Sequence, residues 1–451
     1  MDATDMVDVV VVGGGLAGLT AATILGRAGR SVVVFERARE LGGRARMQAK
    51  EGFLFDLGPH ALYRGGPGMG VLRELGIAFH GAVPPITGYA VQHGVAYRLP
   101  SSPLRLLTSR LLRPASKMEA ARLLLAVSRG TVQAQADWSV EEWLNAQVRG
   151  ADLRGLLRAL LRVFTYTADT GALSATAALA QMRAAIVDNV LYLDGGWQTL
   201  VDGLAVAARR SGVRLRIGTP VVAIERVEAG YTVRLKDGQA VDARDVVIAA
   251  SPAVASSLVD GGAHYALGRL AAKAQPTRMA CLDLALEHLP RPAARFAVGI
   301  DQPLYFSVPS ATARRAPAGG ALIHVARYLP GDAVDPDADR QELEAFVDLL
   351  QPGWREAVVA RRWLPRLTVS HALVRADAGG VRGRLGPAVP GSPHLYVAGD
   401  WVGPAGMLAD ASFASAKQAA EQILAAPSVE IAGRSSCPPM VGRQVVVEAM
   451  R

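Results

Sequence analysis

Cysteine is almost absent from this chain. The 451 residues include only two, Cys281 and Cys437. Two isolated cysteines supply neither a disulfide framework nor the ligand spacing of a metal site, so we expect no metal. Long apolar runs are absent as well, because no uninterrupted stretch is long enough to span a bilayer. The N-terminus carries Asp2, Asp5 and Asp8, which is not the pattern of a signal peptide, and we expect a cytoplasmic protein.

Lysine and aromatic residues are also scarce. Only 5 of the 49 basic residues are lysine, and aromatic residues make up 6% of the chain. The formal net charge is +9, but no basic run is interleaved with aromatic residues, so no nucleic-acid partner is expected. Apolar residues make up 50% of the chain, which is enough for the cores of two or three domains.

The N-terminal segment carries a glycine motif in a strand–turn–helix setting. Val7 to Val12 is rich in β-branched residues and predicts a buried parallel strand, and Leu16 to Ala28 has helical composition. Between and within them lies the pattern Gly13-x-Gly15-x-x-Gly18. In a dinucleotide site the first glycine permits the tight turn, the second lets the backbone approach a pyrophosphate, and the third lets the helix pack closely on the strand.

An acidic residue follows at the expected distance. Ser31 to Phe35 predicts a second strand, and Glu36 stands at its end. A carboxylate at this position accepts hydrogen bonds from a ribose 2′-hydroxyl and repels a 2′-phosphate. The N-terminal segment therefore predicts a dinucleotide-binding site.

Two further motifs resemble one family of flavoproteins. Leu41-Gly42-Gly43-Arg44 follows the acidic residue within one short loop, and His394 to Asp400 is an apolar strand that ends in Gly399-Asp400. Together with the glycine motif, they resemble the N- and C-terminal motifs of the FAD-dependent flavin amine oxidase superfamily, which includes monoamine and polyamine oxidases, protoporphyrinogen oxidase and the phytoene desaturases. The two glycines let the chain pass close to a flat ligand, and Arg44 places a cation near phosphate or flavin.

The resemblance implies roles for residues outside the glycine motif. Asp400 would accept hydrogen bonds from the ribityl chain or lie near the pyrophosphate. The N-terminus of a helix from Met407 to Ala425 would direct its dipole at the N1–C2=O edge of the flavin and stabilise the reduced ring. The backbone of Val222 would face the adenine. The strand and turn from Phe53 to His60 would approach the flavin, so that His60 is either near the ring or a turn histidine bonded to backbone.

The FAD site is thus expected to include nineteen residues: Gly13, Gly15, Leu16, Ala17, Gly18, Glu36, Arg37, Gly42, Gly43, Arg44, Gly58, Pro59, His60, Val222, Gly399, Asp400, Gly406, Met407 and Leu408. We expect non-covalent FAD, because Cys281 falls in a predicted strand and Cys437 lies past the final helix.

The implied fold is α/β, with a Rossmann-type FAD-binding domain (GR2-like) interleaved with an α+β substrate domain. The FAD-binding domain is expected in three parts and the substrate domain in two, the first of them mostly helical. The FAD-binding parts are 1–87, 194–262 and 385–426, the substrate parts are 88–193 and 263–384, and 427–451 is a flexible tail.

Several local expectations complete the interpretation. Gly65 to Gly70 predicts a loop, and Trp354 to Trp363 a helix. Gln239 to Val241 and Asp245 to Ala250 predict separate strands. Leucines and basic residues from Leu104 to Ala126 predict two helices divided at Pro114, which are either core helices with a solvated face or a surface for peripheral membrane contact.

If FAD is bound, the reaction class is transfer of hydride from a substrate C–H to flavin N5. Many amine oxidases of the superfamily have a lysine just ahead of a substrate-domain strand. The matching strand here, Met279 to Leu286, follows Pro-Thr-Arg, and Lys273 lies farther upstream. We therefore expect a desaturase-like enzyme that acts on an apolar substrate, similar to phytoene desaturase or protoporphyrinogen oxidase.

Two alternatives remain open. The first is an amine or amino-acid oxidase that uses O2, with Arg295 and Arg327 as carboxylate clamps. The second is a flavin-binding protein without turnover. The catalytic group is unknown, with His60 and Lys273 as the candidates, and a second glycine motif for NAD(P)H is missing, so O2 or a quinone is the expected electron acceptor.

Overall fold

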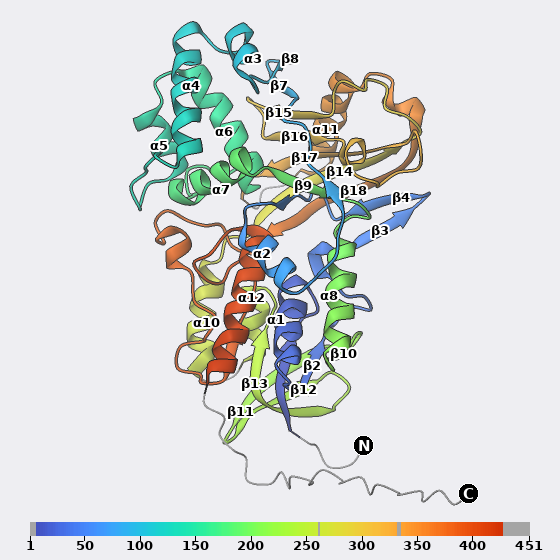
Figure 1. Ribbon diagram of the computed structural model, residues 1–451, viewed down its shortest axis with the longest axis vertical. Coiled ribbons are helices and arrows are strands. Elements are labelled where there is room, and N and C mark those ends of the chain that lie inside the picture. Colours follow the sequence, from blue (N-terminus) through green and yellow to red (C-terminus); the bar gives the residue numbers. More distant parts are fainter. Residues whose placement is uncertain (1–5, 260–261, 332–334, 427–451) are drawn as a thin grey trace, which may run out of the picture.

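The computed structural model describes residues 6–259, 262–331 and 335–426, so the predicted tail from 427 to 451 lies outside the described residues (Figure 1). Its centre is a sheet around β1 (Val7–Val12), which pairs in parallel with β2 (Val32–Phe35) and with β13 (Ala240–Ile248). The strand order is β10-β2-β1-β13-β12-β11, and β19 pairs with β13. The remaining strands of this sheet are β10 (Arg214–Arg216), β11 (Val221–Val227), β12 (Gly230–Leu235) and β19 (Leu395–Val397).

Both faces of this sheet are covered, which explains the continuous valine run of β1. Val9 and Val11 pack against α1 (Leu16–Arg27) and α12 (Leu408–Ala425), whereas Val10 and Val12 pack toward α9 (Pro252–Leu258). Figure 1 shows α12, α1 and α8 (Gln198–Arg210) side by side. In a strand that is covered on both faces, apolar and polar residues do not need to alternate.

A second sheet lies between the first sheet and the far end of the molecule. Its order is β18-β14-β17-β16-β15-β7-β8, and α11 (Pro336–Leu350) packs on one face. His93-Gly94 turns the hairpin of β7 and β8. The strands are β7 (Tyr89–Gln92), β8 (Val95–Arg98), β14 (Thr277–Leu286), β15 (Phe296–Gly299), β16 (Leu304–Ser307), β17 (Ala321–Leu329) and β18 (Val358–Ser370).

A helical block forms the end of the molecule opposite β11 and β12 (Figure 1). Its helices share one apolar core, and Pro114 begins a new helix as predicted, because proline fits the first helical position. The helices are α3 (Pro103–Thr108), α4 (Pro114–Arg129), α5 (Val140–Gln147), α6 (Ala151–Thr165) and α7 (Ala175–Val187).

Short elements join these layers. They are β3 (Met47–Lys50), β4 (Phe53–Asp56), β5 (Leu62–Tyr63), α2 (Pro67–Glu74), β6 (Gly81–Ala82), β9 (Val190–Leu193) and α10 (Gly262–Lys273). No helix among the described residues combines the length and apolar character needed to cross a bilayer.

Three local predictions are wrong. The predicted helix 354–363 is a short 3-10 turn followed by β18, because this segment pairs with β14 along nearly its whole length and tertiary pairing overrides a weak local pattern. The predicted strands 239–241 and 245–250 are one strand, β13, whose first half pairs with β12 and whose second half pairs with β19. The predicted loop 65–70 already contains the start of α2 at Pro67.

The α/β fold with an interleaved second sheet is confirmed. Strands of the first sheet lie at 7–35, 214–248 and 395–397, and those of the second at 89–98 and 277–370. The residue numbers of the five domain segments stay a prediction.

Candidate cofactor and substrate site

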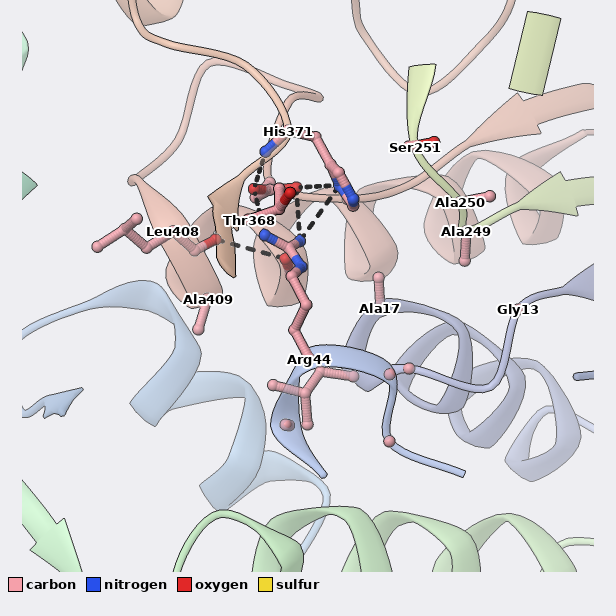
Figure 2. A pocket seen from close by; sticks show the side chains of 18 of the residues that line it. Gly13, Ala17, Arg44, Ala249, Ala250, Ser251, Thr368, His371, Leu408 and Ala409 are labelled. Atoms are coloured by element: carbon pink, nitrogen blue, oxygen red, sulfur yellow. Dashed lines mark hydrogen bonds and ion pairs between the residues drawn. The ribbon is translucent and has the colours of Figure 1, made fainter. Parts of the chain in front are cut away.

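A cavity of about 490 Å³ runs from the turn after β1 to the second sheet. This is the usual size range of small-molecule sites. Figure 2 shows that its walls come from segments far apart in the sequence, including Gly13, Arg44, Ala249, His371 and Leu408. The ends of β1 and β2 and the N-terminus of α12 therefore meet at one cavity.

The three motif glycines meet different surroundings. Gly13 has a φ of +110°, which favours glycine, and a Cβ there would lie 2.5 Å from the Ala249 carbonyl oxygen. A Cβ on Gly18 would lie 1.9 Å from the Gly13 carbonyl oxygen, so only glycine allows α1 to pack this closely on the turn. A Cβ on Gly15 would meet nothing nearer than the Gly42 oxygen at 3.9 Å. Gly15 thus faces open cavity, as a residue approached by a pyrophosphate must.

Glu36 is held at the end of β2 by backbone donors. One carboxylate oxygen accepts the Gly14 N–H at 2.7 Å, and the other accepts the Ala38 N–H at 2.8 Å. The side chain lines the cavity. Each oxygen keeps acceptor capacity for a ribose hydroxyl, because a carboxylate oxygen has two lone pairs.

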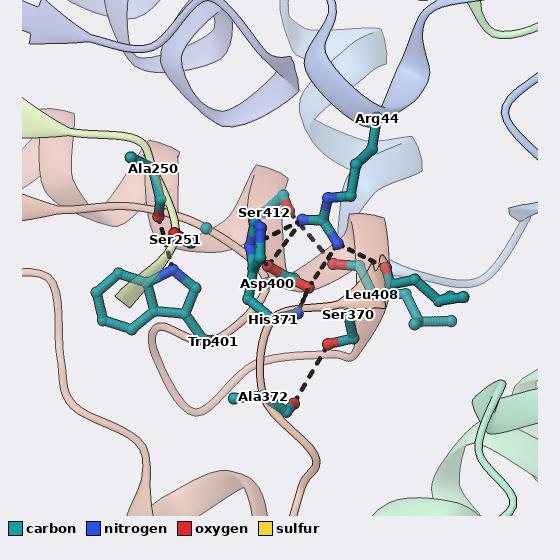
Figure 3. Close-up of polar contacts among 12 residues, drawn as sticks. Arg44, Ala250, Ser251, Ser370, His371, Ala372, Asp400, Trp401, Leu408 and Ser412 are labelled. Carbon is teal, nitrogen blue, oxygen red and sulfur yellow. Dashed lines mark hydrogen bonds and ion pairs between the residues drawn. The ribbon is translucent and has the colours of Figure 1, made fainter. Parts of the chain in front are cut away.

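The Gly42-Gly43-Arg44 loop lies directly against the glycine turn. The Gly42 N–H donates to the Gly14 carbonyl at 2.8 Å. Arg44 then reaches across the cavity and binds Asp400 with two hydrogen bonds of 2.9 Å each. The N- and C-terminal motifs, separated by more than 350 residues, are thereby joined by one bidentate ion pair (Figure 3).

His371 completes this cluster. Its backbone N–H donates to Asp400 at 2.9 Å, and its Nδ1 lies 3.0 Å from the other carboxylate oxygen. Burial opposes ionisation of Asp400, but the charge of Arg44 and the hydrogen bonds from His371 outweigh it and hold the pKa of Asp400 well below its usual value. Asp400 is therefore a fixed negative charge beside the N-terminus of α12.

The start of α12 has unusual backbone geometry. Leu408 has a φ of +55°, which residues other than glycine rarely adopt. Leu408 also lines the cavity. Asp410 follows in the first turn and accepts the Gly68 N–H at 2.8 Å. Burial raises the pKa of Asp410 to about 6, although the Gly68 hydrogen bond acts in the opposite direction.

The end of the cavity next to the second sheet is apolar and aromatic. It is lined by Tyr63, Tyr166, Met279, Leu367 and Leu408. Burial raises the pKa of both tyrosines, so they stay protonated at neutral pH. This end suits a substrate that offers apolar surface.

His60 is a turn histidine, and its proximity to the flavin ring stays a prediction. Its Nδ1 lies 3.0 Å from the Gly58 carbonyl oxygen, as in a turn histidine, and its side chain lines the cavity. Its ring lies 4.9 Å from that of Trp197. Burial lowers the pKa of His60, even though the charge of Asp56 acts to raise it, so the imidazole is neutral at physiological pH.

Fifteen of the nineteen predicted FAD-site residues line the cavity, and four do not: Gly18, Gly58, Val222 and Gly406. Gly18 affects the site through the close packing of α1 on the turn after β1. Val222 is exposed, and its neighbour Val221 lines the cavity instead. Lys273 is exposed at the end of α10 and does not line the cavity. Arg295 is exposed, and Arg327 forms ion pairs with Asp339 and Glu342, so neither proposed clamp reaches the site.

Sequence reasoning missed the cavity residues that belong to no motif, among them Tyr63, Tyr166, Leu367, His371 and Asp410. Asp410 had a usable signal, because it lies in the first turn of the predicted C-terminal helix. The others lie in segments whose relation to the flavin motifs is decided only by folding.

Comparison with known proteins gives the family. The model of the family described as flavin containing amine oxidoreductase matches residues 16–424. Protoporphyrinogen oxidase 2 of Arabidopsis thaliana is 35% identical over 114 residues, which are 25% of this chain and 22% of the relative. 4,4'-Diapolycopene oxygenase of a Methylomonas species is 45% identical over 62 residues, 14% of this chain and 12% of the relative. These matches thus span well under two thirds of either relative.

The fold is shared over a greater length. The crystal structure of an oxidoreductase from Methanosarcina mazei superposes with a TM-score of 0.74 at 19% identity, and the match covers 92% of this chain and 100% of that one. The open face of Gly15, the acceptor Glu36 and the helix N-terminus of α12 all fit FAD. The chain shares its fold with that oxidoreductase and belongs to the flavin containing amine oxidoreductase family.

Proposed function

We propose that this enzyme oxidises an apolar substrate in a desaturase-like reaction, with non-covalent FAD as the hydride acceptor. The observation that carries the proposal is the cavity end formed by Tyr63, Tyr166, Met279, Leu367 and Leu408. The relatives whose names refer to protoporphyrinogen, diapolycopene and carotenoid substrates support it.

The residues of the chain position the reactants in this proposal. When bound, FAD supplies the electron-accepting ring, which takes hydride at N5. Gly15 and the N–H groups at the start of α1 bind the pyrophosphate, and Glu36 orients the ribose. The N-terminus of α12 provides positive potential for the negative charge that reduction creates.

The substrate is held by contact and by exclusion of water. Tyr63 and Tyr166 are buried and protonated, so they offer aromatic faces and hydroxyl groups without charge. The neutral His60 also lines the cavity and can accept a proton released from the substrate. No lysine lines the part of the cavity that the structure describes.

Oxidation of an amine is the second candidate, and Asp410 is the observation that favours it. Asp410 lines the cavity, and its carboxyl group, which accepts the Gly68 N–H, has a pKa raised by burial to about 6. It is ionised above that pH and would attract a substrate ammonium group. The exposed position of Lys273 argues against the amine oxidases that use a lysine at the flavin.

Anaerobic bleaching of the flavin absorbance tests the two candidates. One substrate pool holds polyenes and porphyrinogen-type compounds, and the other holds amines and amino acids. We expect bleaching by the first pool only, and bleaching by the second pool alone would refute the desaturase proposal. Readmission of air or of a soluble quinone to the bleached enzyme then shows which of these two acceptors reoxidises it.

Two variants make the result specific. Lys273→Met is expected to leave the rate of flavin reduction unchanged, because Lys273 lies outside the cavity. Asp410→Asn is expected to abolish a response to amines if the second candidate is correct, and to leave bleaching by the apolar pool within a fewfold of the parent enzyme.

A further inference from the structure

An exposed apolar surface lies on α3 and α4, at the end of the molecule opposite β11 and β12 (Figure 1). Leu104 and Leu107 on α3 are 70% and 71% exposed, the highest values among the exposed large apolar side chains of the described residues. Met118 and Leu125 on α4 are 60% and 50% exposed. With Leu124 at 42%, five exposed large apolar side chains lie on these two consecutive helices. They need an explanation, because single exposed leucines are ordinary but clusters are not.

The exposure of these side chains is not caused by the lack of a core, because other leucines of the same segment are buried. Leu106, Leu111 and Leu112 from the same segment are buried against α6 and α7 in the core of the helical block. The exposed residues therefore form a second apolar face, in addition to the one that packs inward.

Several hydrogen bonds hold α3 in place. The Ser102 hydroxyl accepts the Arg105 N–H and caps α3, and the Thr108 hydroxyl donates to the Leu104 carbonyl. Lys117 of α4 donates from Nζ to the Leu107 carbonyl at 2.7 Å. Leu104 and Leu107 are thus presented to solvent on a supported scaffold.

The charge around this face has one sign. Residues 98–129 contain seven basic residues and one acidic residue, a net charge of +6 out of +9 for the whole chain. The acidic residue, Glu119, accepts the backbone N–H groups of Arg149 and Gly150 and so is directed at the protein. Arg110 and Arg113 are exposed and form no ion pair within the described part of the chain, and the same is true of Arg122.

We propose that this face, formed by Leu104, Leu107, Met118 and Leu125 with Arg110, Arg113 and Arg122, docks the enzyme on an anionic phospholipid bilayer. Apolar side chains that enter the acyl boundary and arginines that meet lipid phosphates are the two contributions to interfacial binding. The face projects at one end of the long axis and carries unpaired positive charge, which fits a broad anionic surface better than a protein groove. Binding is peripheral, since no described helix can cross the bilayer.

Docking on a bilayer is independent of the reaction that we propose for the cavity. Binding to lipid is a property of α3 and α4, which lie outside the cofactor cavity. If the substrate is apolar, it would dissolve in the same bilayer and so be close to the enzyme.

Co-sedimentation of the FAD-loaded full chain with vesicles tests the proposal. One set of vesicles is phosphatidylcholine alone, and the other is an equal mixture with phosphatidylglycerol. We expect binding to the mixed vesicles that weakens as sodium chloride is raised, and much weaker binding to phosphatidylcholine, because the arginines act through electrostatic attraction.

Variants separate the two contributions. Leu104→Ser with Leu107→Ser should weaken binding to the mixed vesicles about tenfold or more. Neutralising Arg110, Arg113 and Arg122 to glutamine should weaken it by about fivefold per residue. Matched changes on α8, Val206→Ser and Arg209→Gln with Arg210→Gln, remove exposed residues of the same kinds elsewhere and should leave binding unchanged.

The flavin spectrum and the melting temperature of each variant establish that it is folded. Equal binding to both kinds of vesicle, or a loss no larger for the α3 variants than for the α8 controls, would overturn the proposal. Absence of binding to both kinds of vesicle would overturn it too. Oligomers of the parent enzyme that the α3 variants disrupt would then identify the face as a protein interface.

Discussion

At the scale of single residues, the glycine motif combines two different requirements. Gly18 is needed by the fold, because a side chain there would overlap the Gly13 carbonyl, whereas Gly15 faces open cavity, and we propose that the ligand needs it. The backbone of Gly15 is extended, with φ −81°, so any residue can adopt it.

Gly15→Val should therefore yield a folded but colourless protein. We expect the unfolding free energy of its apoprotein to lie within about 1 kcal/mol of the parent value, since the new side chain points into open cavity. Gly18→Ala is the contrasting variant and should destabilise the apoprotein by about 3 kcal/mol. Urea unfolding of the apoproteins and the flavin absorbance of the purified proteins measure both effects. A yellow, fully loaded Gly15→Val protein would disprove the pyrophosphate site.

The Arg44–Asp400 pair makes a second residue-scale prediction. Arg44→Met removes the cation but leaves the buried carboxylate with His371 alone. Because Arg44 is partly exposed, we expect a loss of about 2 kcal/mol at neutral pH, below the cost of breaking a fully buried pair. FAD retention should fall as well.

The pH dependence of that loss has a definite sign. The folded pKa of Asp400 is lowered, so its ionised form stabilises the folded state above the unfolded pKa of about 4, and this contribution is lost as the pH falls through the folded value. The difference in unfolding free energy between parent and Arg44→Met should be greatest at neutral pH and should shrink in acid. A difference that stays constant with pH would show that the charge of Asp400 is not involved.

At the scale of elements, three adjacent strands of the second sheet share a buried charge network. Asp283 on β14 lies opposite His324 on β17 and Arg362 on β18. Its carboxylate contacts His324 Nδ1 at 2.5 Å and the Arg362 guanidinium at 2.6 Å. Burial opposes ionisation of Asp283, but these two partners outweigh it and lower its pKa. Cys281 lies in the same group, but Asp283 is already paired, so the cluster is a charge network in which the thiol is a minor partner.

Arg362→Met should destabilise the protein by about 3 kcal/mol, because it leaves Asp283 buried with one partner fewer. The adjacent Arg361 is exposed on the opposite face of β18, and Arg361→Met should change the unfolding free energy by less than about 0.5 kcal/mol. Chemical unfolding of both variants provides the comparison. Equal effects would mean that the network contributes nothing specific to the packing of β14, β17 and β18.

At the scale of the whole molecule, the cofactor site links parts of the chain that are otherwise distant. The cavity is lined by the β1–α1 turn, by Val221, by the end of β18 and by the start of α12. A ligand held by all of these should stabilise the folded chain as a unit. FAD at 100 times its dissociation constant should raise the unfolding free energy by about 2.7 kcal/mol.

Thermal unfolding of the apoprotein with increasing FAD measures this coupling. The melting temperature should rise with FAD concentration for the parent chain and stay constant for Gly15→Val. Stabilisation of the variant to the same extent would place the ligand elsewhere.

The sequence by itself determined the parts of the protein in which ligand contacts are local. The turn from Gly13 to Gly18 and the acceptor Glu36 lie on one strand–turn–helix–strand unit, so the spacing of residues predicts their geometry. The role of Asp400 is implied instead by the resemblance of its segment to the C-terminal motif of the family. The division of α3 and α4 is a local effect of Pro114.

Tertiary structure alone decided the rest. Tyr63, Tyr166, Leu367 and His371 reach one cavity from separate segments, and no local spacing encodes that meeting. The strand β18 is also a product of folding, since its residues acquire strand geometry by pairing with β14. Local patterns fix what a short segment can do alone, whereas the substrate end of the cavity exists only once two sheets have packed against each other.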